Sequence, residues 1–252
     1  MVNKIEIIPV KGLPTIKEGD NIGKLIVDRL KDINLGLRDG DIVVVAHSIV
    51  SKAEGKTFRL DEIQPSDFAV QLGRLTGKDP RHTEVILRNS KKIVRIGHGI
   101  IICETKHGFV CANAGVDASN AGGSDVVISL PDNPDESALK IRQEIRSLTN
   151  VNVAVIITDS FGRPFRKGSV NVAVGCSGIN PLADIRGEKD LYGRALRSKV
   201  ICVADEIASA AGLVMGEADE GIPAAVVRGY SYDPTNIPAS AIIRDEHEDL
   251  FR

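Results

Sequence analysis

The chain reads Pro-Asp-Glu-Ser-Ala-Leu-Lys-Ile-Arg-Gln-Glu-Ile-Arg-Ser-Leu-Thr at residues 134–149 and Val-Asn-Val-Ala-Val-Ile-Ile-Thr-Asp at residues 151–159. The apolar side chains of the first segment recur at helical spacing: Ala138, Ile141, Ile145 and Leu148. The second segment is a continuous apolar run that ends in a carboxylate, which is typical of a buried strand. An amphipathic helix leading directly into a buried strand indicates a fold in which helices and strands alternate.

The same alternation extends toward the N-terminus. Residues 41–47, Asp-Ile-Val-Val-Val-Ala-His, predict a second buried strand, which we expect to feed a functional loop. The segment before it predicts a helix with Asp20 as its cap. The apolar residues of that helix share one stripe: Ile22, Leu25, Ile26, Leu30 and Ile33.

Further helical patterns occupy about 66–76, 80–89 and the alanine-rich segment 203–214. The first has Ser66 as its candidate N-cap and three apolar residues on one face: Phe68, Leu72 and Leu75. We expect this helix and the next one to pack on the first sheet.

Between Ile93 and Asp117 the pattern changes to neighbouring strands. Apolar runs at 100–103 and 109–112 flank Glu-Thr-Lys-His-Gly, which predicts a β-hairpin with Gly108 in its turn. Hairpin strands beside strand–helix alternation predict an α+β or mixed α/β fold built on mixed, largely antiparallel sheets. Because no repeat or Gly/Ser linker divides the chain, we expect one unit with two intertwined lobes, very roughly 1–160 and 161–252.

Composition narrows the classes of function. A hydrophobic content of 42% over 252 residues is enough for a substantial core. The formal net charge of -2 and the absence of a basic run argue against nucleic-acid binding. The four cysteines form no C-x-x-C pair, so a zinc site is not expected. No signal-peptide core and no membrane-length apolar run occur, which predicts a cytoplasmic protein.

Three carboxylates stand where apolar runs enter glycine-containing loops: Asp117, Asp159 and Glu217. Oxygen donors of this kind suit Mg²⁺ or Mn²⁺, which complete their coordination with water and substrate phosphates. Asn120 shares the first loop, and the Ser160 hydroxyl beside Asp159 is a further ligand for metal or phosphate. The alternative for any single carboxylate is that it caps the next turn, but three together favour nucleotide chemistry.

Three basic residues follow Asp159 closely in the sequence. Arg163, Arg166 and Lys167 follow Asp159, where they suit a phosphate or a substrate with several carboxylates, or equally a solvated surface. Lys52 is placed to reach a phosphate, whereas we favour a hydrogen-bonded structural histidine over a catalytic base for His47.

Familiar nucleotide motifs are missing. The string Gly162 to Ser169 lacks the spacing of a P-loop, and no G-x-G-x-x-G follows a strand, so neither a P-loop nor a Rossmann unit is supported. Gly-x-Ser-x-Gly is also absent, which argues against a serine hydrolase.

Several long strings, in one order along nearly the whole chain, resemble the coenzyme F420-0:L-glutamate ligase family. They are Ile-Pro-Val-Lys-Gly-Leu-Pro-Thr-Ile-Lys-Glu-Gly-Asp (8–20), Ser-Lys-Ala-Glu-Gly (51–55), Asn-Ala-Gly-Val-Asp-Ala-Ser-Asn (113–120), Thr-Asp-Ser-Phe-Gly-Arg (158–163), Lys-Asp-Leu-Tyr-Gly-Arg (189–194), Val-Ala-Asp-Glu-Ile-Ala (203–208) and Gly-Ile-Pro-Ala-Ala-Val-Val-Arg-Gly (221–229). The resemblance implies two interleaved lobes. It also implies GTP-dependent addition of L-glutamate to coenzyme F420-0, then of a second, γ-linked glutamate, with release of GDP and phosphate.

The resemblance further implies a homodimer, two divalent ions (Mg²⁺ or Mn²⁺) and K⁺. It assigns one ion to Asp117 and Asp159 and the other to Ser160 and Glu217. By position, the residues implied in GTP binding are Leu13, Pro14, Thr15, Ile16, His47, Ser48, Lys52, Asn120, Met215, Gly216, Glu217, Ala218, Asp219, Glu220, Gly221 and Ile222.

The chemistry that fits is phosphoryl transfer from GTP to the acceptor carboxylate, followed by attack of the glutamate amine on the acyl phosphate. Asp117 and Asp159 would act through the metals, while Arg163 and Lys167, with Arg166, would hold the anionic acceptor. Two alternatives stay open: another metal-dependent kinase or ligase that uses ATP or GTP on an anionic metabolite, and a non-catalytic nucleotide-binding regulator.

Overall fold

The computed structural model describes residues 4–250 and is built around a five-stranded sheet of order β1-β12-β2-β8-β9. The strands are β1 (Glu6–Pro9), β12 (Ala224–Arg228), β2 (Ile42–Ala46), β8 (Ala154–Arg163) and β9 (Arg166–Ser177). Only the pair β2 and β8 is parallel, and each other neighbouring pair in this sheet is antiparallel. The α+β prediction with largely antiparallel sheets is therefore confirmed.

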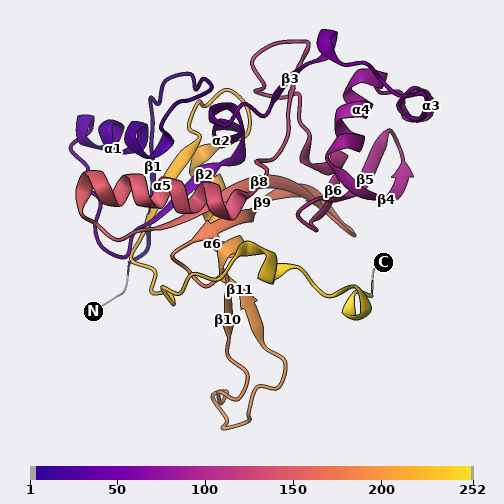
Figure 1. Cartoon of the computed structure of the whole chain (residues 1–252). Coiled ribbons are helices and arrows are strands. Elements are labelled where there is room, and N and C mark those ends of the chain that lie inside the picture. The colour runs from indigo at the N-terminus through magenta and orange to yellow at the C-terminus, as the bar shows by residue number, and fades with distance from the viewer. Residues whose placement is uncertain (1–3, 251–252) are drawn as a thin grey trace.

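Helices cover both faces of this sheet (Figure 1). Helices α1 (Ile22–Asp32) and α5 (Pro134–Thr149) lie on one face, and α6 (Val203–Met215) lies on the other. Alternate residues of β2 explain this arrangement, because Val43 and Val45 join the core under α1 and α5 whereas Ile42 and Val44 join the core under α6. The uninterrupted apolar run of β2 is thus a strand buried on both sides.

A second module is inserted between α2 (His47–Ala53) and α5. Its neck is the antiparallel pair β3 (Thr57–Arg59) and β7 (Val126–Ile128). Beyond the neck lie α3 (Asp67–Thr76), α4 (Pro80–Arg88) and a three-stranded sheet of β4 (Ser90–Gly97), β5 (Ile100–Thr105) and β6 (Val110–Ala112). The module has its own buried core, which includes Leu72, Ile86 and Ile101.

A second antiparallel pair projects from the other side of the molecule. Strand β10 (Leu182–Asp184) pairs with β11 (Val200–Cys202), and the segment between them extends away from the body in Figure 1. Short 3-10 helices occupy Leu60–Glu62, Asn113–Gly115, Ala239–Ile242 and Glu246–Glu248. Among residues 4–250, no helix has both the length and the apolar character needed to cross a bilayer.

Several predicted elements are confirmed. Helix α5 occupies residues 134–149 as predicted, Ser66 caps α3 through the N–H of Ala69, and β5 and β6 form the hairpin that contains Gly108. The boundary near residue 160 falls inside β8, and the division into lobes stays a prediction.

Other predictions were wrong. Asn21, not Asp20, caps α1 by accepting a hydrogen bond from the Lys24 N–H, because the Asp20 carboxylate is engaged by the Lys17 N–H in the preceding turn. Leu148, predicted on the apolar stripe of α5, is 43% exposed in the last turn of the helix.

The prediction that α3 and α4 pack on the first sheet was wrong. They pack against each other and against the other elements of the inserted module, not on the five-stranded sheet. The buried face of α3 includes Leu72 and Gly73, while Phe68 and Leu75 are 56% and 72% exposed. Gly73 explains the choice of face: a Cβ there would lie 2.9 Å from the carbonyl oxygen of Lys78, so only glycine permits this close approach.

Candidate active site

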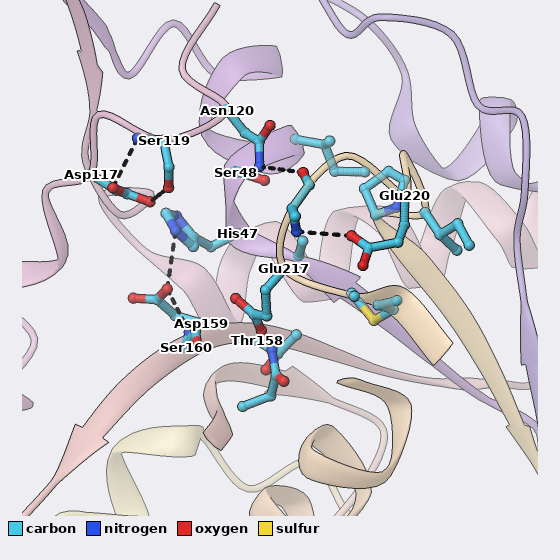
Figure 2. Close-up of a pocket in the computed structure, with 18 of the residues that line it drawn as sticks. His47, Ser48, Asp117, Ser119, Asn120, Thr158, Asp159, Ser160, Glu217 and Glu220 are labelled. Carbon is cyan, nitrogen blue, oxygen red and sulfur yellow. Dashed lines mark hydrogen bonds and ion pairs between the residues drawn. The ribbon is translucent and has the colours of Figure 1, made fainter. Parts of the chain in front are cut away.

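A cleft of about 580 Å³ lies where β2 and the parallel strand β8 leave the core of the sheet. Its lining comes from segments that are far apart in sequence: 13–16, 46–49, Lys52, 111–113, 115–117, 119–120, 158–162, Asn171 and 215–223. Figure 2 shows side chains from these segments directed toward a common space. Every predicted metal-binding or nucleotide-binding residue therefore lies in one cleft.

Helix α2 supplies one wall. It begins at His47, directly after β2, so the functional loop expected after residues 41–47 is a helix instead. The extended backbone of Ala46 turns the strand into the helix without a connecting loop. Ser48 and Lys52 are four residues apart and hence lie on the same side of α2, where both line the cleft. The Lys52 ammonium donates to the carbonyl oxygen of Asn120, and burial lowers the pKa of Lys52.

His47 and Asp159 form a buried pair on the cleft floor. Nε2 of His47 lies 3.2 Å from Oδ1 of Asp159, and the two side chains are 7% and 15% exposed. Burial opposes ionisation of both groups, but their mutual attraction outweighs it. The pKa of His47 is raised, with Asp117 as a further contributor, and the pKa of Asp159 is lowered, helped by the backbone N–H of Ser160. Asp159 is thus held as a carboxylate.

Asp159 lies within β8 and not in a strand-end loop, contrary to the sequence prediction. The strand continues to Arg163 because β9 pairs with it along this length, with Asp159 opposite Val172 and Ser160 opposite Asn171. Strand pairing fixes the backbone at Asp159, while the side chain stays directed into the cleft (Figure 2).

Asp117 is positioned by a tight loop of the inserted module. Asn113, Ala114 and Gly115 all have positive φ angles and turn the chain after β6. The Asp117 backbone then pairs with Ile128, and its carboxylate accepts hydrogen bonds from the N–H and hydroxyl of Ser119. Ser119 was missed by the sequence reasoning, although Asp-Ala-Ser is a pattern in which an Asp side chain bonds the backbone two residues later.

The segment 215–222 closes the opposite side. Gly216 ends α6 with φ 74° and ψ 179°, and Glu217 then points into the cleft (Figure 2). The Glu220 carboxylate accepts from the Ala218 N–H at 2.8 Å, and the Asn120 amide donates to the Ala218 carbonyl at 3.3 Å. The Asp117 loop and the Glu217 loop therefore meet across the mouth of the cleft.

Arg163, Arg166 and Lys167 are not among the described residues that line the cleft. They form the tip of the β8–β9 hairpin, where the Arg163 guanidinium donates to the carbonyl oxygen of Lys167 at 2.9 Å. The structure therefore separates these cations from the carboxylates that precede them in sequence, and their role in holding the acceptor stays a prediction. Thr158 and Asn171 also line the cleft, and the sequence reasoning assigned neither a role, although Thr158 begins the string 158–163.

The donor set of the cleft fits hard divalent cations. Asp117, Asp159, Glu217 and the hydroxyl of Ser160 all supply oxygen, the ligand that Mg²⁺ and Mn²⁺ prefer. Within residues 4–250, no three His, Cys, Asp or Glu side chains converge closely enough to hold a metal by themselves. Ions bound here would therefore need water and substrate oxygens to complete their coordination.

Comparison with known proteins gives a consistent result. Residues 12–229 match the family model described as F420-0:Gamma-glutamyl ligase. Over 250 residues, 98% of this chain and 99% of the relative, the chain is 48% identical to the coenzyme F420:L-glutamate ligase of Methanothermobacter thermautotrophicus. It is 49% identical over 251 residues to the ligase of the same name from Methanocaldococcus jannaschii, covering 99% of this chain and 97% of the relative. The corresponding ligase of Archaeoglobus fulgidus is 43% identical over 249 residues, again covering 99% and 97%.

Proposed function

Since the chain belongs to the F420-0:gamma-glutamyl ligase family and is therefore a ligase, we propose that it joins L-glutamate to coenzyme F420-0 at the expense of GTP. We also propose that it then adds a second glutamate through a γ-linkage. The observation that supports this most strongly is the cleft, in which three carboxylates from separate segments and Lys52 surround a space large enough for a nucleotide.

In this proposal GTP lies between the segment 13–16, α2 and the loop 215–222. Lys52 supplies a cation for the phosphates, and Asn120 and the backbone of Ala218, already joined by a hydrogen bond, border the nucleotide. The loop 216–221 has a glycine at each end, Gly216 and Gly221, where the backbone carries no side chain and a ligand can approach closely.

Two divalent ions would be held by Asp117 with Asp159 and by Ser160 with Glu217. When bound, such ions neutralise charge on the transferred phosphoryl group. His47 keeps Asp159 ionised and oriented through its 3.2 Å contact, so we assign it a positioning role in addition to its place beside the nucleotide. K⁺ as a further activator and a homodimeric assembly also belong to this proposal.

The reaction proceeds in two balanced steps. An oxygen of the acceptor carboxylate attacks the γ-phosphorus of GTP, and the bond to GDP breaks. The amine of L-glutamate, after losing a proton, then attacks the carbonyl carbon of the resulting acyl phosphate, and phosphate leaves as the amide forms. No side chain becomes covalently attached to the substrate.

Mass spectrometry of F420 species after incubation with F420-0, GTP, Mn²⁺ and L-glutamate tests the proposal. We expect products heavier by one and then two glutamyl units, with one GDP and one phosphate released for each. GDP release that needs F420-0 but not glutamate would indicate a kinase instead, and GTP binding without turnover would indicate a regulator.

A further inference from the structure

A second pocket, of about 550 Å³, lies outside the cleft and has no part in the proposed function. Its lining residues are 38–41, Arg142, 152–153, Gly178, 228–232 and Pro234. None of them lines the cleft. The second pocket is nevertheless almost as large as the cleft, whose volume is about 580 Å³, so it also has room for a ligand of nucleotide size.

The second pocket lies at the opposite end of the five-stranded sheet from the cleft. Strand β2 begins after Asp41 in the second pocket and ends before His47 in the cleft. The parallel strand β8 likewise begins after Val153 and carries Asp159 into the cleft. The five residues of β2 rise about 3.3 Å each, which separates Asp41 from His47 by about 20 Å. The two pockets are therefore separate sites at opposite ends of the same strands.

Both carboxylates of the second pocket are already engaged by the protein. Asp41 is 1% exposed and pairs with Arg228 through contacts of 2.8 and 2.7 Å. Asp41 also accepts a hydrogen bond from the backbone N–H of Arg38, and Asp39 accepts one from the N–H of Asn152. The lining contains three arginines and two aspartates, so its net charge is positive. The second pocket therefore favours an anion, whereas the five acidic residues of the cleft favour metal ions.

Arg142 of α5 is held in place by the backbone around it. Its Nε donates to the carbonyl oxygen of Val153 at 2.8 Å. Gly178, with φ 76°, makes room for the guanidinium, because a Cβ there would lie 2.4 Å from Nε and 2.8 Å from the central guanidinium carbon. In the part of the chain that the structure describes, Arg142 forms no ion pair, and its two terminal nitrogens remain available as donors. A guanidinium fixed in this way suits bidentate binding of a phosphate or carboxylate.

A second cation and two aromatic rings complete the second pocket. Arg38 is exposed at its rim and forms no ion pair with any residue from 4 to 250. Tyr230 and Tyr232 follow β12 and pack against the core under α6, which holds their rings in place. Burial raises the pKa of Tyr232 against the opposing effect of the Arg142 guanidinium. The Tyr232 phenol therefore keeps its proton and can donate a hydrogen bond to an anion beside Arg142.

We propose that the second pocket binds an aromatic phosphate ester of nucleotide size, and that it does so without a metal ion. Arg142 binds the phosphate through its terminal nitrogens, and Arg38 adds a second cation, which suits the nearly double charge of a phosphomonoester better than a single carboxylate. Tyr230 and Tyr232 supply the flat apolar surface against which the aromatic part of the ligand packs. This site does not depend on the proposed function, because none of its residues belongs to the cleft.

Hydrogen-exchange mass spectrometry of the full chain with GMP and excess EDTA locates the site. GMP lacks the β- and γ-phosphates, and chelation removes the metal ions through which a nucleotide would bind in the cleft. We expect slower exchange at 38–41, 152–154 and 228–234, with unchanged exchange at 113–120 and 215–222 in the cleft. Slower exchange confined to the two cleft segments, or no effect of GMP anywhere, would overturn the proposal.

Calorimetric titration in EDTA separates the chemical parts of the ligand. GMP should bind about tenfold more tightly than ribose 5-phosphate, because the two share a phosphomonoester but only GMP has a ring that packs on the tyrosines. L-glutamate, which has carboxylates but neither a phosphate nor a ring, should not displace GMP at equal concentration. Equal affinity for GMP and ribose 5-phosphate would overturn the assignment of the tyrosines, and displacement by L-glutamate would overturn the assignment of a phosphate.

Substitutions test the two cations. Arg142→Gln should weaken GMP binding about tenfold or more. Arg38→Gln changes an exposed side chain and should weaken binding about threefold with an unchanged Tm, which keeps the test decisive if Arg142→Gln unfolds. Arg146→Gln, one turn further along α5 and outside the second pocket, is the control and should bind GMP as the wild type does. Wild-type affinity in both Arg142→Gln and Arg38→Gln would overturn the proposal. If the wild-type protein releases no GDP in the ligase assay, the proposed function fails but the GMP result stands.

Discussion

The imidazole of His47, the first residue of α2, lies 3.2 Å from the carboxylate of Asp159 in the middle of β8. This contact joins the wall that carries Ser48 and Lys52 to the strand that carries Asp159 and Ser160. It raises the pKa of His47 and lowers that of Asp159 against the opposing effect of burial. The Asp159 carboxylate therefore stays negatively charged on the floor of the cleft, beside the buried imidazole of His47.

Asp159→Asn should reduce GDP release about a hundredfold or more, because an amide keeps the shape of the side chain but removes its charge. The fold should persist, since Asn still offers an oxygen to His47. Phosphate-release assays and denaturant unfolding measure the two effects. Asp28→Asn, an exposed carboxylate on α1 that pairs with Lys24, is the matched control and should change neither. Near-normal turnover in Asp159→Asn would contradict the metal assignment.

Removal of divalent ions should weaken GTP binding and so remove the stabilisation of the fold that bound GTP provides. With GTP and Mn²⁺ at a hundred times the Kd, mass action stabilises the fold by about 2.7 kcal/mol, which raises the Tm by roughly 5–10 °C. Chelation of the metal should cancel most of this shift, and Asp117→Asn should weaken it. Differential scanning fluorimetry measures each case. An unchanged shift after chelation would show that GTP binds without metal.

Gly216→Ala should weaken GTP binding about tenfold without unfolding the protein. Gly216 has φ 74° and ψ 179°, a conformation that non-glycine residues adopt only at a cost of about 1–3 kcal/mol. A Cβ would also lie 2.2 Å from the Glu220 carboxyl carbon and displace that side chain, which accepts from the Ala218 N–H within the loop. Equilibrium titration with GTP measures the change. Gly97→Ala, where an added Cβ meets nothing within 4 Å, is the control on the inserted module. Equal affinity in both variants would argue against a role for the loop in nucleotide binding.

Glu84→Gln should lower stability in a pH-dependent way. The Glu84 carboxylate accepts from the N–H and hydroxyl of Ser66 at 3.0 and 2.7 Å and pairs with Arg88, so its pKa lies below the ordinary value of 4.5 despite partial burial. A lowered folded-state pKa stabilises the protein above pH 4.5, and this contribution is lost as the pH falls through the folded-state value.

We therefore expect Glu84→Gln to cost about 1–2 kcal/mol of unfolding free energy at pH 7 and progressively less in acid. Urea unfolding at several pH values measures the difference. Glu62→Gln, which alters a carboxylate that is 71% exposed and lies 3.3 Å from Arg59, should cost less than about 0.5 kcal/mol. A constant difference between wild type and Glu84→Gln at all pH values would show that the carboxylate charge is not the cause.

Local sequence patterns were sufficient to predict helix ends and turns wherever residues close in sequence fix the backbone conformation. Helix α5 begins after Asn133, whose side chain accepts from the Glu136 N–H, and ends at Asn150 in the left-handed region, so both ends are encoded within a few residues. The same holds for Ser66 at the start of α3 and for Gly108 in the β5–β6 turn. The quoted sequence strings were likewise sufficient to predict the family, because they are long and occur in one order.

By itself, then, the sequence determined α1, α3, α4, α5 and α6, the buried strands β2 and β8, the family and the chemical types of the cleft residues. Only the tertiary structure decided that Asp159 lies inside a strand, that the face of α3 is set by Gly73, and that Arg163 and Lys167 stand apart from the carboxylates. Each of these depends on a partner that is distant in the chain or on close packing after folding: β9 for Asp159, the turn at Lys78 for α3, and the hairpin tip for the two cations. Hydrophobic spacing encodes which side of an element is buried, but not which other element will cover it.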